Sequence, residues 1–183
     1  MRGDGVDKRI RFRDQRGKYW PSPSELEPFF LTQRGREQWF YGGNDSWGLD
    51  ISGLYGTDNL PTYAQIGGAG LGSQVESHFE MDANLDYGVL VSFDRYGGGY
   101  NDHYCSINDS TRLHEWVRTL HQDLRPVGLY IPFNDAWAAL KEFMETDGEM
   151  PKCIKWVNGS DLPPYAFPDR SDISFNSLVA IND

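Results

Sequence analysis

The sequence is poor in the residues that build redox and metal sites. Its 183 residues include two cysteines, Cys105 and Cys153, and four histidines. A lone disulfide is rare in a chain without an export signal, so we expect two free, partly buried thiols. No run of about 18 apolar residues occurs, and the charged segment Met1–Arg9 lacks the apolar stretch of a secretory signal. These absences predict a cytoplasmic protein with no membrane partner.

Motifs for metal and phosphate chemistry fail on their spacing. His114-Glu115 begins like the zinc-protease helix motif, but the second histidine should stand at position 118, which is Arg118. The glycine-rich segment Gly67–Gly72 is followed by Ser73 and not by the lysine of a phosphate-binding loop. The sequence therefore predicts no cofactor at either place.

His103 and Cys105 are the remaining candidates for chemistry. Two residues apart on a strand, they share a face and could meet one metal ion, but no further ligand pair accompanies them. As a nucleophile, Cys105 or Cys153 would need an activated thiol, but neither stands at a nucleophile elbow or at a helix N-terminus that would lower its pKa. We therefore expect no enzyme, no catalytic residue and no metal site.

Charge is distributed unevenly along the chain. Residues 1–20 hold seven Lys and Arg against three Asp, whereas the remainder holds ten Lys and Arg against 24 Asp and Glu. A strongly acidic body repels nucleic acid and anionic membranes and speeds the encounter with a basic partner. Acidic surfaces also serve solubility alone, so the charge leaves both interpretations open.

The order of expected elements predicts an α+β fold: one domain with a mainly antiparallel sheet and a few packed helices. We expect a flexible basic arm over residues 1–21, the domain over 22–158 and a loosely attached extension over 159–183. Alternation and turn signals predict strands at 38–41, 47–51, 75–81, 87–93, 100–107, 127–131 and 152–157. Apolar periodicity and caps predict helices from Ser22 to Phe30, over 111–121, and over 135–147 behind an Asn134 cap.

The segment from Ile131 to Trp156 carries a resemblance. A strand ends in Ile131-Pro132, an alanine-rich helix runs through Phe143 to Gly148, and a strand led by Pro151 closes on Trp156. This arrangement resembles the Imm1 immunity proteins of bacterial polymorphic toxin systems. The resemblance implies a small α+β protein, encoded beside a toxin that is often a nucleic-acid deaminase, which it binds and blocks without catalysis. Phe143 and Trp156 are expected to be buried.

The toxin-binding residues are predicted from charge and aromatic character. Acidic groups at a helix C-terminus oppose the helix dipole, so an acidic cluster there without visible compensation suggests a binding role, although a solvated acidic surface is the simpler explanation. Trp47 and Tyr96 are candidate aromatic anchors, with core packing as the alternative for Trp47. The predicted contact residues are Glu142, Glu145, Asp147, Glu149, Trp47 and Tyr96.

Two other functions stay open at this point. A hydrolase or transferase whose site has no recognisable motif would fit the same composition, as would a general interaction module of a regulatory assembly. A single tight, basic partner would favour the immunity protein, and many loose partners would favour the module.

Overall fold

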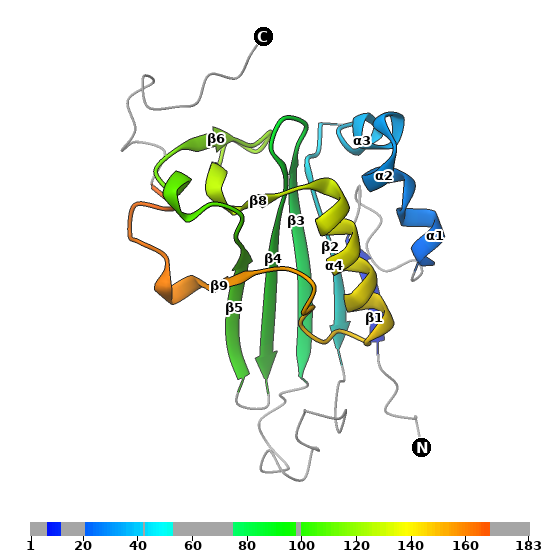
Figure 1. Ribbon diagram of the computed structural model, residues 1–183. Coiled ribbons are helices and arrows are strands. Elements are labelled where there is room, and N and C mark those ends of the chain that lie inside the picture. Colours follow the sequence, from blue (N-terminus) through cyan, green and yellow to red (C-terminus); the bar gives the residue numbers. More distant parts are fainter. Residues whose placement is uncertain (1–6, 12–20, 42, 53–74, 98–99, 169–183) are drawn as a thin grey trace.

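The computed structural model describes residues 7–11, 21–41, 43–52, 75–97 and 100–168 (Figure 1). In this part of the chain, a seven-stranded antiparallel sheet has the order β1-β2-β3-β4-β5-β9, and β8 pairs with β4 beside it. A two-stranded sheet, β6-β7, lies at one end. This single-domain α+β fold confirms the predicted class, and none of the described helices is long and apolar enough to cross a membrane.

The strands of the large sheet are β1 (Asp7–Arg11), β2 (Ser46–Ser52), β3 (Glu76–Asn84), β4 (Gly88–Gly97), β5 (Tyr100–Ser106), β8 (Tyr130–Ile131) and β9 (Trp156–Asn158). The small sheet consists of β6 (Trp116–Arg118) and β7 (Leu124–Pro126). The α-helices are α1 (Pro23–Leu26), α2 (Pro28–Leu31), α3 (Gln33–Trp39) and α4 (Phe133–Glu145). Short 3-10 helices are η1 (Ser110–Arg112), η2 (Val127–Leu129) and η3 (Gly159–Asp161).

Strict alternation gives the central strands two different faces. In β3, Phe79 and Met81 are buried, whereas His78 and Glu80 point to the opposite side, because successive side chains of a strand alternate. Helix α4 lies across the apolar face (Figure 1), with the Phe143 ring centred 5.0 Å from that of Phe79. The α-helices thus cover one face of the sheet, and the β6-β7 hairpin and the short 3-10 helices contact the other face.

Aromatic packing joins the first helices to this core. Trp39 and Trp47 meet edge to face with ring centroids 4.5 Å apart, and the Trp39 indole N–H donates to the Asp45 carbonyl at 3.0 Å. The expected strand at 38–41 is therefore wrong: Gln38 and Trp39 complete α3. Thr32 caps this helix by accepting from the Gly35 N–H, and the aromatic residues that favoured a strand instead direct the helix into the core.

The helix start at Ser22 is confirmed, with Glu25 accepting from the Ser22 N–H at 2.7 Å in a capping box. The predicted flexible arm differs from the structure, because Asp7–Arg11 forms β1 and pairs with β2. Backbone ladders need no apolar periodicity, so an edge strand of charged residues gives no sequence signal. The rest of residues 1–20 lies outside the described part of the chain.

The helix expected over 111–121 is also wrong. After η1 the chain turns and forms β6, which pairs with β7, while Leu113 and Val117 join a second apolar cluster with Leu90 and Tyr130. Leu113 and Val117 are spaced as on one face of a helix, but the packing of this cluster buries both without a helix. Leu120, which belongs to the same predicted apolar face, is half exposed.

Residues 127–131 are only partly the predicted strand: η2 precedes the two residues of β8. The predicted final strand shrinks to β9, which begins at Trp156. Helix α4 begins at Phe133 with Pro132, not Asn134, in the capping position, and Gly148 follows it with a φ of 93°.

The expected extension is partly ordered against the domain. Ala166 is fully buried, and its carbonyl accepts from the Trp116 indole N–H at 3.1 Å. This contact holds the start of the extension on β6, whereas residues 169–183 lie outside the described part.

Candidate protein-binding surface

The face of the sheet opposite α4 carries a row of carboxylates and histidines. The antiparallel register sets Asp50 of β2, His78 of β3, Asp94 of β4 and His103 of β5 directly opposite one another in turn. His78 Nδ1 lies 2.7 Å from Asp50 Oδ1, and His103 Nδ1 lies 2.5 Å from Asp94 Oδ1. Four neighbouring strands therefore present two carboxylate–imidazole pairs side by side.

Further acidic groups flank this row. Glu76 Oε2 lies 3.4 Å from His78 Nε2, and Glu80 is exposed two residues further along the same strand. Tyr96 is 43% exposed, with its ring centred 5.6 Å from that of His78. We use the name open face for Asp50, Glu76, His78, Glu80, Asp94, Tyr96 and His103.

The open face combines carboxylates with a protonated imidazole. The hydrogen bond to Asp94, aided by that to Cys105 and opposed by partial burial, raises the pKa of His103 to about 10, so this imidazole is a cation at neutral pH. Burial, together with the charge of Asp94, raises the pKa of the Tyr96 hydroxyl. The His103 imidazolium thus shares this face with the carboxylates of Asp50, Glu76, Glu80 and Asp94.

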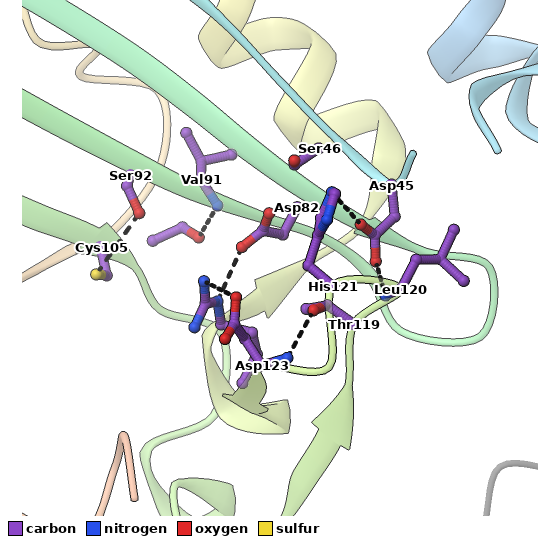
Figure 2. A network of polar contacts seen from close by, with 12 residues as sticks. Asp45, Ser46, Asp82, Val91, Ser92, Cys105, Thr119, Leu120, His121 and Asp123 are labelled. Atoms are coloured by element: carbon purple, nitrogen blue, oxygen red, sulfur yellow. Dashed lines mark hydrogen bonds and ion pairs between the residues drawn. The ribbon is translucent and has the colours of Figure 1, made fainter. Parts of the chain in front are cut away.

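One end of this side of the sheet is closed by the β6-β7 hairpin. Arg125 of β7 donates to Asp82 Oδ2 at 2.9 Å and lies 3.6 Å from Asp123. The buried Asp45 carboxylate accepts from the Leu120 N–H at 2.7 Å and so holds the hairpin tip, as Figure 2 shows. Asp82, Arg125 and Asp45 thus bind partners within the domain, and the hairpin that they hold marks where the open face ends.

At its other edge the open face meets η3. A Cβ atom at Gly159 would lie 2.2 Å from Cδ2 of His103, so only glycine permits this approach. The loop therefore packs directly on the imidazole and fixes its position beside Asp94.

Asp94, His103 and Cys105 form a line that resembles a nucleophilic triad. Cys105 Sγ lies 3.8 Å from His103 Nε2 and 3.9 Å from Ser92 Oγ (Figure 2 shows the second contact). However, Cys105 is 1% exposed and packs in the second apolar cluster, so a substrate has no path to the sulfur. Within the described ranges, no three His, Cys, Asp or Glu side chains are placed to hold a metal ion.

Sequence reasoning overlooked Asp50, His78 and Asp94. The signal that could have revealed them was the strand alternation itself, since it places His78 and Asp94 on the face away from Phe79. Their pairing with one another depends on cross-strand register, which a single strand does not reveal.

The acidic cluster predicted after α4 is held by internal partners. Backbone N–H groups of Lys152 and Cys153 donate to the two oxygens of Glu142 at 2.9 and 3.1 Å. Desolvation raises the pKa of Glu142, but these hydrogen bonds outweigh it and lower the pKa below its usual value. Glu149 pairs with buried Arg95 at 3.1 Å, and Glu145 lies 3.7 Å from Lys141. Internal hydrogen bonds and ion pairs therefore compensate the acidic charges at the end of α4, although the sequence alone does not show these contacts.

The other predicted contact residues separate into surface and core. Asp147 is exposed at the end of α4 with a φ of 52°. Tyr96 lies on the open face, on the opposite side of the sheet. Trp47 is only 3% exposed, so it packs in the core, as the alternative interpretation expected, and is not a surface anchor.

The two thiols are free: Cys105 is buried, but Cys153 is exposed and lies outside any strand, so the packing expected for it is wrong. Although the residue is exposed, partial desolvation of its sulfur, together with the neighbouring Glu142, raises the pKa of the Cys153 thiol to about 12. A thiol with such a pKa is a poor nucleophile at neutral pH.

An α+β domain with a sealed cysteine and an acidic, accessible sheet face has the features of a protein that binds another macromolecule. The family comparison gives the same class a specific identity: the family model for Immunity protein Imm1 matches residues 63–158, just over half of the chain. The chain belongs to the Imm1 family of immunity proteins. Neither the curated proteins nor the solved structures include a match.

The family match covers β3, β4, β5 and everything from β6 to β9, including α4. Both the α4-to-β9 unit that carries the sequence resemblance and most of the open face lie inside it. Membership in an immunity family suggests a non-enzymatic role and implies a cognate toxin as partner.

Proposed function

We propose that this protein neutralises its cognate toxin by stoichiometric binding at or near the toxin active site. The match to Immunity protein Imm1 over residues 63–158 is the observation that carries the proposal. The resemblance further implies a toxin that acts on nucleic acid, and we propose a deaminase domain. In this proposal the two proteins meet in the cytoplasm, and neither nucleic acid nor membrane is a partner of the immunity protein.

The charge of the chain supports a basic target. Enzymes that act on nucleic acid present Lys and Arg around their substrate cleft, and an acidic protein that occupies such a cleft competes with the phosphate backbone. The net charge of −10 accelerates that association at low ionic strength. Stoichiometric binding needs no catalytic group, which agrees with the inaccessible sulfur of Cys105.

Two acidic surfaces are available for the contact. The first is the end of α4, where Glu145 and Asp147 are exposed, while Glu142 and Glu149 support the fold through their internal bonds. The second is the open face with Tyr96. All of these exposed groups remain candidate contacts under the proposal.

Co-expression with the toxin domain encoded by the neighbouring gene tests the proposal. We expect growth of the bacterial host to be restored, a 1:1 complex in size-exclusion chromatography with light scattering, and loss of deamination of single-stranded DNA or RNA in proportion to added immunity protein. Protection at substoichiometric amounts, or absence of a complex, would contradict neutralisation by binding.

A second measurement tests the enzyme alternative. Elemental analysis of the purified chain is expected to show no stoichiometric metal. One zinc ion per chain that is lost in a His103→Ala variant would reopen that alternative.

A further inference from the structure

We infer that one end of the sheet, where α3, the β3-β4 turn and the β6-β7 hairpin meet, is the apolar centre of the toxin contact, and that it receives an apolar hollow of the toxin domain bordered by Lys or Arg. This inference rests on the proposed function, because the Imm1 family supplies the partner. Charge mainly accelerates and orients an encounter, whereas affinity comes from a few apolar and aromatic residues near the centre of an interface. An acidic protein therefore needs such a centre to hold its partner.

Three large apolar side chains are exposed at this end of the sheet. Tyr41 is 62% exposed after α3, Leu85 is 55% exposed in the turn between β3 and β4, and Leu120 is 50% exposed in the turn between β6 and β7. Figure 1 shows the three segments at the same end of the sheet. We use the name sheet-end surface for Tyr41, Leu85 and Leu120.

Asp45 ties these three segments together. Its carbonyl accepts from the Trp39 indole N–H at 3.0 Å and from the Ala83 N–H at 2.8 Å, and its buried carboxylate accepts from the Leu120 N–H at 2.7 Å (Figure 2). Trp39 stands two residues before the exposed tyrosine, and Ala83 stands two residues before the leucine of the β3-β4 turn. The bonds to one buried residue therefore gather three distant parts of the chain, each with an exposed apolar side chain.

Both leucines stand in turns, where polar residues are the rule. In the β3-β4 turn, the Asn84 side chain accepts from the Asp86 and Tyr87 N–H groups at 2.9 and 3.2 Å. In the β6-β7 turn, the Thr119 hydroxyl accepts from the Asp123 N–H at 3.1 Å. Side chains other than the leucines thus fix both turns, and fixed turns lose little conformational entropy on binding. A single exposed leucine is ordinary, but large apolar side chains gathered on fixed turns mark an interaction site.

Carboxylates border the sheet-end surface. Asp86 is exposed next to the leucine of the β3-β4 turn, and Glu37 is exposed on α3, where it accepts from the Gln33 amide at 3.1 Å. The arginines of the hairpin, Arg118 and Arg125, donate to a backbone carbonyl and to a carboxylate within the domain. An apolar centre with a charged rim is the usual anatomy of a protein interface. The toxin surface that fits it has an apolar hollow flanked by Lys or Arg.

Matched leucine-to-alanine variants test the location. Leu85→Ala and Leu120→Ala each shorten one side chain of the sheet-end surface, and Leu31→Ala makes the same change on α2, where the leucine is 42% exposed. Because all three side chains are exposed, each variant should melt within about 2 °C of wild type. Surface-bound kinetics of the full chain with the neighbouring gene's toxin domain, inactivated at its catalytic residue, give the association and dissociation rates at two salt concentrations.

We expect Leu85→Ala and Leu120→Ala each to raise the dissociation constant about tenfold or more, mainly through faster dissociation that persists at high salt, because apolar burial is not screened. Tyr41→Ala should weaken binding by about the same factor, since tyrosine is enriched among the residues that dominate binding energy. Leu31→Ala should change the dissociation constant less than about twofold. Asp86→Asn should slow association about two- to threefold, and only at low salt.

Hydrogen exchange of the wild-type chain locates the contact without any substitution, and so serves if a variant does not fold. Addition of the inactivated toxin domain should slow the exchange of backbone amides at 84–87 and 119–123. The amides of α2, which carries the control leucine, should exchange as they do in the free protein.

The outcomes separate the two proposals. Wild-type protein that does not bind the toxin would overturn the proposed function and this inference with it. Wild-type affinity retained by both folded leucine variants would overturn the inference alone, as would exchange protection confined to other segments. A doubled mass of the free wild-type chain that the leucine variants lose would assign the sheet-end surface to a second copy and also overturn the inference.

Discussion

Replacement of Glu142 by glutamine tests whether the acidic end of α4 is structural. The wild-type carboxylate accepts N–H groups from Lys152 and Cys153 and so ties the last turns of α4 to the segment that leads into β9. Glutamine keeps the size and the helix propensity of glutamate, but it offers one neutral acceptor in place of two charged oxygens.

The expected magnitude follows from these two contacts. A hydrogen bond to a charged group contributes about 1.5–3 kcal/mol, and a neutral one about 0.5–1.5 kcal/mol. Glu142 is only partly buried, so solvent screening reduces the difference, and we expect a loss of about 1–2 kcal/mol. In a domain of this size that loss lowers the melting temperature by roughly 2–8 °C.

The effect should depend on pH in a defined direction. Because the folded-state pKa of Glu142 lies below its unfolded value, its ionised form stabilises the fold above about pH 4.3, and this stabilisation is lost as the pH falls through the folded-state pKa. Urea unfolding at pH 7 should therefore separate Glu142→Gln from wild type, and the gap should narrow below about pH 4.

Glu145→Gln is the matched control. It removes the same charge from the same helix, but its contact with Lys141 is exposed and contributes about 0.3–0.5 kcal/mol, which relief of the helix dipole offsets. Equal stabilities of the two glutamine variants at pH 7 would refute the structural role of Glu142.

Three further perturbations follow from the fold. Phe143→Ala, which empties a fully buried site beside Phe79, should cost about 3–5 kcal/mol in urea unfolding, and an unchanged melting temperature would mean that α4 packs differently. Gly88→Ala should lower the melting temperature sharply, because the residue has a φ of 104° and its Cβ would lie 2.0 Å from a backbone oxygen; a stability equal to wild type would contradict this turn. Asp94→Asn should return the pKa of His103, followed by NMR, from about 10 toward 6.5. Because the folded-state pKa of His103 is raised, the Asp94–His103 pair stabilises the fold fully below pH 6.5, and this stabilisation is lost as the pH rises toward 10. An unmoved titration of His103 would exclude the ion pair.

Local patterns in the sequence determined the elements whose signal is short-range. Strand alternation predicted the positions and the buried residues of β2 and β3, because period-two burial is a property of each strand alone, and the continuous apolar run at 87–93 predicted β4. The capping box at Ser22, the apolar face of α4 and its end at Gly148 were equally readable, since they depend on residues within one or two turns. The same patterns gave the α+β class and, through Ile131 to Trp156, the resemblance to Imm1 proteins that the family match confirmed. Phe143 is buried as expected, while Trp156 is partly buried and donates its indole N–H to the Pro151 carbonyl at 2.7 Å.

Only the tertiary structure decided what depends on contacts between distant segments. Trp39 belongs to a helix, and residues 111–121 do not form one, because packing against the sheet outweighs local propensities of a few tenths of a kcal/mol per residue. The partners of Glu142 lie ten and eleven residues away, so the acidic end of α4 looked uncompensated in the sequence. Asp94 meets His103 through the register of two strands, and the open face exists because the described α-helices pack on the other side of the sheet. Register and layer order arise from backbone pairing and burial summed over the whole domain, and no single segment encodes them.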